Sequence, residues 1–106
     1  MKAIELTTQS FDSTLAAASQ PVLVDFHAEW CGPCRMMGPV IEQVAGEQQG
    51  RAVVAKVNVD DAPEIAQRYH INSIPTLIVF KDGQPVASVR GAQSKGAIEA
   101  LLARAN

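Results

Sequence analysis

Two cysteines stand where an apolar strand gives way to a helix, and this junction restricts the possible fold more than any other feature. The run VLVDFHA (residues 22–28) has the composition of a buried strand. It is followed by WCGPC (residues 30–34), which holds both cysteines of the chain and opens a predicted helix to about Gln49. Two thiols three residues apart can close into a disulfide and reopen, or they can supply half of a metal site.

Predicted strands and helices alternate along the whole chain. We expect strands at residues 3–6, 22–28, 52–59, 76–80 and 85–90, and helices that begin near residues 8, 31, 63 and 94. Strands separated by helices should pair in parallel through right-handed crossovers, whereas the tight turn KDGQ (residues 81–84) joins an antiparallel hairpin. The order βαβαβαββα predicts an α/β fold with a central mixed five-stranded sheet flanked by four helices. In such sheets the site lies at the carboxyl ends of strands, where the cysteines stand.

Length and charge narrow the classes of protein to which the chain can belong. The 106 residues suffice for one hydrophobic core, so we expect a single domain over residues 1–106. The net charge of −2 is slightly negative, whereas proteins that bind nucleic acid are typically basic. No apolar run approaches the roughly 18 residues that a membrane span needs. The polar segment MKAIELTTQSFD does not resemble a signal peptide. We therefore expect a cytoplasmic protein, and a monomer, with no nucleic-acid or membrane partner.

The position of the cysteines at a helix N-terminus predicts redox reactivity. The free N–H groups and the positive end of the helix dipole favour a thiolate at Cys31, and a thiolate is the species that attacks a disulfide. Cys34, one turn later and expected to be more buried, can then displace the target from Cys31. A disulfide across so short a loop adds little stability, so reactivity explains it better. Pro33 has no N–H with which to stabilise the Cys31 thiolate, which favours a reductase over an oxidase.

An aspartate interrupts the apolar strand that precedes the cysteines. Asp is depleted from strands, and alternation places Leu23, Asp25 and His27 on one face. Because both faces of a central strand are covered, we expect Asp25 to be buried with a raised pKa and to accept the Cys34 proton. A purely structural aspartate is the alternative. Lys56 similarly interrupts the next strand, where it either faces Asp25 or is simply exposed.

Residues from three separated segments are candidates for a substrate surface around Cys31. Pro75 precedes a predicted strand and either marks its boundary or forms a cis peptide bond in a tight turn. Trp30 either belongs to the surface or packs in the core. A flat, nearly uncharged surface suits main-chain contacts to an extended segment of a partner protein. The residues assigned to this surface are Trp30, Gly32, Pro33, Ile74, Pro75, Gly91 and Ala92.

The segment from Val24 to Met36 closely resembles the active-site segment of the thioredoxin family. The tripeptide IPT (residues 74–76), the turn FKDG (residues 80–83) and Gly91-Ala92 fit the same family at the expected separations. The resemblance covers nearly the whole chain, and it implies the thioredoxin fold.

The resemblance also implies a role for each candidate residue. It makes Cys31 the nucleophile, Cys34 the resolving thiol, Asp25 the buried proton acceptor with Lys56 as its partner, and Pro75 a cis-proline opposite the disulfide. It implies a protein-disulfide oxidoreductase that reduces disulfide-containing target proteins and is recharged by a thioredoxin reductase. The electrons would come from NADPH bound to that reductase, because no nucleotide-binding loop is present here and no bound cofactor is expected.

One residue departs from the family pattern, and other functions remain open. His27 stands where many members carry an aromatic residue, and a histidine can titrate near neutral pH, although we expect a neutral, packed imidazole. A zinc site would use Cys31, Cys34, His27 and His70. An adaptor that only binds partners is a third class, and an oxidase or isomerase is the nearest enzymatic rival.

Overall fold

A mixed five-stranded sheet forms the centre of the molecule. The computed structural model describes residues 2–105. The strand order is β1-β3-β2-β4-β5, in which β1 (Ile4–Leu6), β3 (Val53–Asn58) and β2 (Val22–His27) are parallel. β4 (Thr76–Lys81) is antiparallel to β2, and β5 (Gln84–Arg90) is antiparallel to β4. The predicted element order is confirmed, and each strand end lies within one residue of its predicted place.

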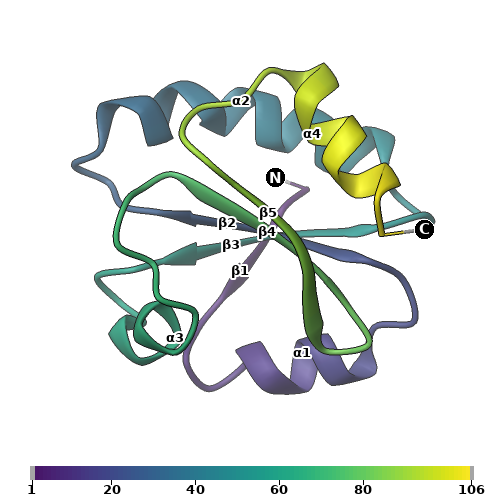
Figure 1. Cartoon of the computed structure of the whole chain (residues 1–106), viewed down its shortest axis with the longest axis horizontal. Coiled ribbons are helices and arrows are strands. Elements are labelled where there is room, and N and C mark those ends of the chain that lie inside the picture. Colours follow the sequence, from purple (N-terminus) through teal and green to yellow (C-terminus); the bar gives the residue numbers. More distant parts are fainter. Residues whose placement is uncertain (1, 106) are drawn as a thin grey trace.

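Helices cover both faces of this sheet. α2 (Gly32–Glu47) and α4 (Lys95–Ala103) lie on one face, and α1 (Phe11–Ala17) and α3 (Pro63–Arg68) lie on the other (Figure 1). β2 is the middle strand, and its carboxyl end leads through a short loop into α2. Over residues 2–105, no helix combines the length and the hydropathy needed to cross a membrane.

The first helix begins later than the sequence predicted. It was expected from Thr8, but residues 7–10 form a turn in which Ser10 Oγ accepts a hydrogen bond from Thr7 N at 2.9 Å. The N–H of Phe11 then donates to the Thr7 carbonyl oxygen at 3.0 Å, and α1 starts at that residue. The turn delivers Phe11 into the core, where it is fully buried.

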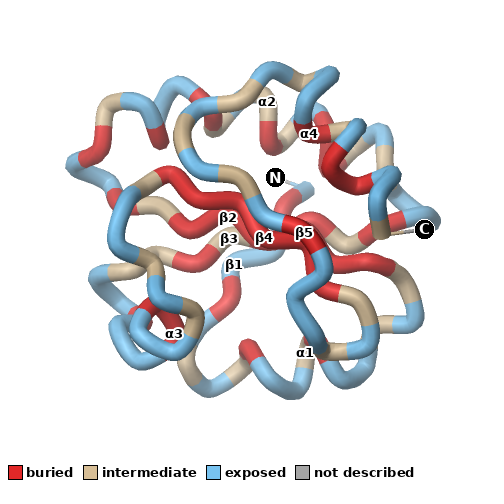
Figure 2. Tube along the Cα trace, viewed as in Figure 1, coloured by how far each residue is buried: buried red, intermediate tan, exposed pale blue. Residues whose placement is uncertain are grey.

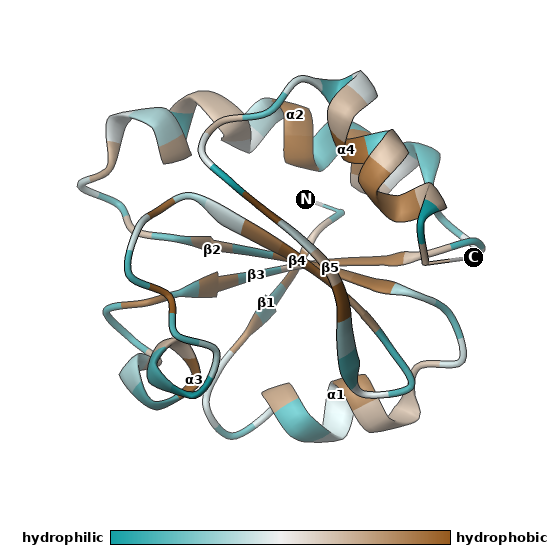
Figure 3. Cartoon of the chain, viewed as in Figure 1, coloured by the Kyte–Doolittle hydropathy of each residue, from teal (hydrophilic) through white to brown (hydrophobic). Residues whose placement is uncertain are grey.

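Alternation along β2 divides the core into two layers. Leu23 packs with the inward side chains of α2 and α4, whereas Val24 and Phe26 pack with those of α1 and α3. Figure 2 shows the sheet as the most buried part of the chain, and Figure 3 shows hydrophobic stretches in its centre, interrupted by hydrophilic positions. Asp25 shares the side of Leu23 and is only 1% exposed, so its predicted burial is confirmed.

Candidate active site around the disulfide

Cys31 and Cys34 form a disulfide at the start of α2. Their Cα atoms are 5.2 Å apart, within the range of disulfide geometry, and Cys31 Sγ accepts a hydrogen bond from Cys34 N at 3.3 Å. The expected difference in burial is absent, because each cysteine is 5% exposed. The two residues differ instead in their surroundings. Cys31 faces the carbonyl of Ile74, and Cys34 lines a pocket that also contains His27.

The residues between the cysteines explain why α2 begins here. Pro33 lies in the first turn, where its missing N–H breaks no helical hydrogen bond and its fixed φ suits the helix. A Cβ built on Gly32 would meet no heavy atom within 4 Å, so the space beside Cys31 is open. When the disulfide opens, the Cys31 sulfur is left at the positive end of a 16-residue helix, which stabilises a thiolate.

The loop before β4 approaches Cys31 from a distant part of the sequence. The peptide bond between Ile74 and Pro75 is cis, as the family resemblance implied. The carbonyl oxygen of Ile74 lies 3.9 Å from Cys31 Sγ. Gly91 joins this group, because its N–H donates to the Pro75 carbonyl oxygen at 2.8 Å, and its φ of 85° favours glycine. Ala92 follows as an exposed residue.

Trp30 lies on the surface beside the disulfide. Its side chain is 68% exposed, so the alternative of core packing is wrong. Its Nε1 donates a hydrogen bond to Asp60 Oδ2 at 2.8 Å. The neighbouring loop residue Glu29 accepts a second hydrogen bond, from Arg35 Nη1 to its carbonyl oxygen at 2.7 Å. Asp60 was not predicted as a site residue, because a partner thirty positions away leaves no local motif.

A largely apolar pocket adjoins this tryptophan. It has a volume of about 440 Å³, and its lining combines the Trp30 loop with the segment before the cis peptide. The lining residues are Trp30, Val59, Ile71, Asn72, Ser73 and Ile74. The pocket therefore extends the predicted surface toward residues 71–73, which the sequence analysis had not included.

Asp25 lies on the side of β2 that packs against α2 and α4, in register with Lys56 on β3. Burial raises the pKa of Asp25 to about 7, while Lys56 lowers it and Glu5 raises it further. The Oδ1 atom of Asp25 has no hydrogen-bond partner within residues 2–105. Lys56 is only half-buried, and it takes part in neither of the two ion pairs found among residues 2–105. Register thus brings Lys56 opposite Asp25, without a direct salt bridge.

The comparisons with known proteins agree with this arrangement. A sequence model of the family described as thioredoxin matches residues 2–104. A thioredoxin of Mycobacterium tuberculosis is 50% identical over 95 residues, which cover 90% of this chain and 82% of that protein. A thioredoxin of Staphylococcus aureus is 47% identical over 102 residues, which cover 96% of each chain. The chain belongs to the thioredoxin family.

A fused relative is also similar to this thioredoxin-family chain. The bifunctional thioredoxin reductase/thioredoxin of Mycobacterium leprae is 48% identical over 95 residues. The match covers 90% of this chain but only 21% of that protein, so the present chain spans about a fifth of the fused relative's length.

A second pocket opens on the Cys34 side of the disulfide. Its volume is about 540 Å³, and six of its lining residues are Glu5, His27, Glu29, Cys34, Arg35 and Lys56. His27 is half-buried, and burial lowers its pKa, with Lys56 acting in the same direction. Glu5 was not predicted as a site residue, because it comes from β1, two strands away from Asp25.

The zinc alternative is not supported by the geometry. Residues 2–105 contain no group of three or more His, Cys, Asp or Glu side chains arranged to hold a metal ion. His70 lines a different pocket, with Arg68 and Arg104. It lines neither the pocket beside Cys34 nor the pocket beside Trp30.

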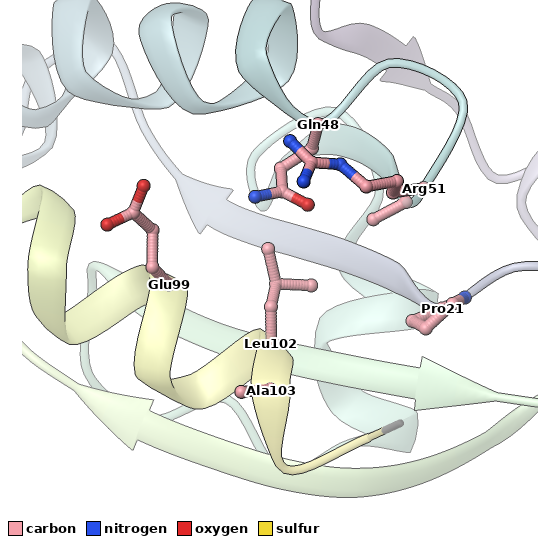
Figure 4. Close-up of a pocket in the computed structure, with 7 residues that line it drawn as sticks. Pro21, Gln48, Arg51, Glu99, Leu102 and Ala103 are labelled. Carbon is pink, nitrogen blue, oxygen red and sulfur yellow. The ribbon is translucent and has the colours of Figure 1, made fainter.

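A further pocket lies at the far end of the sheet. Figure 4 shows Gln48, Arg51 and Glu99 among its lining residues, between the end of α2 and α4. Its volume is about 390 Å³. Pro21 also lines it and immediately precedes β2, whereas the cysteines follow the opposite end of that strand. No cysteine or histidine lines this pocket, so it offers nothing to thiol chemistry.

Proposed function

We propose that this chain is a thioredoxin-type protein-disulfide reductase that works through Cys31 and Cys34. The observation that carries the proposal is the disulfide at the N-terminus of α2, with one sulfur beside a wall formed by Ile74. A permanent structural bridge across three residues would add little stability. A reversible bridge at this place gives a thiolate where backbone N–H groups favour it.

The proposed reaction has two thiol–disulfide exchanges. The Cys31 thiolate attacks one sulfur of the target disulfide, forming a mixed disulfide and releasing the first target thiolate, which takes a proton from water. Cys34 then gives its proton to the Asp25 carboxylate, and its thiolate attacks Cys31 Sγ. The Cys31–Cys34 disulfide forms, the second target thiolate leaves, and the target has gained two electrons.

Asp25 is suited to the proton transfer in the second exchange. It is buried on the side of β2 that faces α2, and its pKa of about 7 keeps both protonation states accessible near neutral pH. We propose that Lys56, its register partner, limits this upward shift of the pKa, because its charge favours the carboxylate.

We propose that the surface around Cys31 binds an extended segment of the target. The exposed ring of Trp30 and Ile74 line one pocket, and the Ile74 carbonyl oxygen lies beside Cys31 Sγ. The space at Gly32 is open, and Gly91 is hydrogen-bonded to Pro75. Small and apolar residues leave main-chain groups free to pair with an extended peptide.

The chain needs an external source of electrons for repeated turnover. We propose a thioredoxin reductase that draws on NADPH, because the fused Mycobacterium leprae relative bears both names. The cytoplasm, where thiols are kept reduced, is the compartment that suits this role, and we propose that the chain acts there as a monomer without a bound cofactor.

Catalysed reduction of insulin disulfides by dithiothreitol tests the proposal without a cognate reductase. We expect the chain to accelerate precipitation of the released insulin chains, and we expect the double variant Cys31→Ser/Cys34→Ser to be inactive. If that double variant retained the biological role of the chain, the adaptor function would be supported instead.

The direction of electron flow separates a reductase from an oxidase or isomerase. We expect equilibration with reduced and oxidised glutathione to give a reduction potential more negative than that of the glutathione pool. The physical reason is Pro33, which offers no N–H to stabilise the reduced form. A clearly more oxidising potential would support the oxidase.

A further inference from the structure

His27 is a half-buried histidine that the proposed reaction does not use. Its Nε2 atom is enclosed and has no hydrogen-bond partner within the described residues 2–105. It lines the same pocket as Cys34 and Lys56. Buried polar atoms normally have a hydrogen-bond partner, so an enclosed nitrogen without one calls for an explanation. A water molecule in the pocket shared with Cys34 can supply this partner.

The geometry of β2 connects His27 to Asp25. Residues two apart on a strand point to the same side and are separated by about 6.6 Å along it. Asp25 is 1% exposed, so its carboxyl group has almost no contact of its own with solvent. His27 lies one step nearer the end of the strand, where the pocket of about 540 Å³ opens. That volume holds several water molecules, because each occupies about 30 Å³.

Charged groups that act on His27 come from β1, β3 and two loops, and none comes from β4. Burial disfavours protonation of His27 most, and Lys56 on β3 acts in the same direction. Together they outweigh Glu5 on β1 and the loop residues Glu29 and Asp61, which favour protonation. Arg35 on α2 completes the charged lining of the pocket. The pKa of His27 is therefore held below its usual value. A neutral imidazole has one donor and one acceptor nitrogen, so it can accept a proton on one side and release another on the other.

We propose that His27 is a relay residue that carries protons between the buried Asp25–Cys34 pair and solvent through the pocket beside Cys34. This inference rests on the proposed function, because it concerns the second of its two exchanges. Among residues 2–105, His27 Nε2 has no hydrogen bond to either sulfur, and the relay acts through Asp25 and pocket water.

The relay moves one proton from Cys34 to solvent. Cys34 transfers its proton to the Asp25 carboxylate, and the Cys34 thiolate displaces the second target thiolate from Cys31. The protonated Asp25 passes that proton through water to the free nitrogen of His27. The imidazolium then releases a proton to solvent, which restores neutral His27 and the Asp25 carboxylate. No electrons pass through His27. When a donor dithiol reduces the disulfide, the same path runs inward.

A single-turnover reaction with dithiobis(nitrobenzoate) separates the two exchanges, since each releases one coloured thiolate. The first phase reports attack by Cys31 and the second reports closure by Cys34. In His27→Gln and His27→Ala we expect an unchanged first phase and a second phase about tenfold slower at pH 7. We expect the slowing to fade above about pH 9, where hydroxide removes the proton directly. Added imidazole should restore the second phase in His27→Ala and leave the wild type unchanged.

The other histidine supplies a matched control. His70 lines a separate pocket and has a φ of 56°, which asparagine tolerates, so His70→Asn should leave both phases as in the wild type. His27→Gln retains a polar side chain and serves if His27→Ala is poorly folded.

Three results would overturn the relay. They are a normal second phase in both His27 variants, equal slowing of both phases, and a slow second phase that imidazole does not restore. Insulin reduction by the same proteins keeps this test apart from the proposed function. If the wild type reduces insulin and the His27 variants have the same second-phase rate as the wild type, only the relay is wrong. If the wild type fails to reduce insulin, the proposed function itself is wrong.

Discussion

Asp25 and Lys56 occupy paired positions on the neighbouring parallel strands β2 and β3. The charge of Lys56 favours the ionised form of Asp25, but burial disfavours that form more strongly and raises the pKa of Asp25 to about 7. A carboxyl group in this state destabilises the fold once it is ionised, yet it can give and take a proton near neutral pH. Stability and the proposed proton transfer are therefore linked through one residue.

We expect Asp25 to make the free energy of unfolding fall as the pH rises. The carboxyl group titrates at about 3.9 in the unfolded chain and at about 7 in the folded one, so the folded state holds the proton more tightly. Its stabilising effect is complete below about pH 4 and is lost as the pH rises through 7. Between about pH 5 and pH 8.5 the wild type should lose on the order of 3 kcal/mol more than Asp25→Asn.

Urea unfolding of the two oxidised proteins at several pH values measures this difference. A constant gap between wild type and Asp25→Asn over that range would show that Asp25 does not titrate with a raised pKa.

We expect Cys34→Ser to accumulate a covalent adduct with a target protein. Cys31 can still attack, but no second thiol is present to release the target, so the mixed disulfide persists. Non-reducing gel electrophoresis should show a band that disappears on reduction. Cys31→Ser is the matched control and should form far less adduct, because Cys34 lies within the helix and lacks the N-cap position that favours a thiolate at Cys31. Equal amounts of adduct from both variants would contradict the assignment of Cys31 as the attacking thiol.

We expect loss of the Asp60 carboxylate to weaken the binding of protein targets. The hydrogen bond from Trp30 Nε1 to Asp60 Oδ2 fixes an exposed ring beside the disulfide, and such a bond contributes about 1 kcal/mol. Asp60→Ala should raise KM for insulin about fivefold with little change in kcat. Asp60→Asn keeps an acceptor and should be closer to the wild type. A change in kcat alone would argue against a binding role for this contact.

We expect the aromatic cluster on the α1 and α3 face to support stability and not chemistry. Phe80 is fully buried, with its ring centroid 5.8 Å from that of Phe11 and 5.1 Å from that of Tyr69. Phe80→Ala should cost about 3–5 kcal/mol in urea unfolding, whereas Val86→Ala, at a 46% exposed site, should cost little. Disulfide reduction per folded molecule should be unchanged, and a large loss for Phe80→Ala would connect this cluster to the site.

The order of elements could be predicted because each strand and helix carries its own local pattern. The alternation of Leu23, Val24 and Asp25 along β2 predicted the two core layers, and the burial of Asp25 followed from it. The start of α1 could not be predicted, since the turn at residues 7–10 depends on the geometry of one serine hydroxyl.

The thiol pair was evident from the sequence, whereas its surroundings were not. Asp60 and Glu5 reach the site through the parallel pairing of distant strands, and no local spacing marks them. The burial of Cys31 also differed from expectation, because Ile74 approaches it from a loop more than forty residues away. Contacts of this kind depend on tertiary packing and not on local propensity.

Reduction of insulin coupled to NADPH through a thioredoxin reductase tests the central claim most directly. The measurement is the loss of NADPH absorbance with the wild-type chain, with Cys31→Ser and with Cys34→Ser. The account predicts steady consumption of one NADPH for each disulfide reduced in the wild type, and turnover abolished in both variants. No turnover by the wild type with several reductases, or turnover that survives Cys31→Ser, would contradict it.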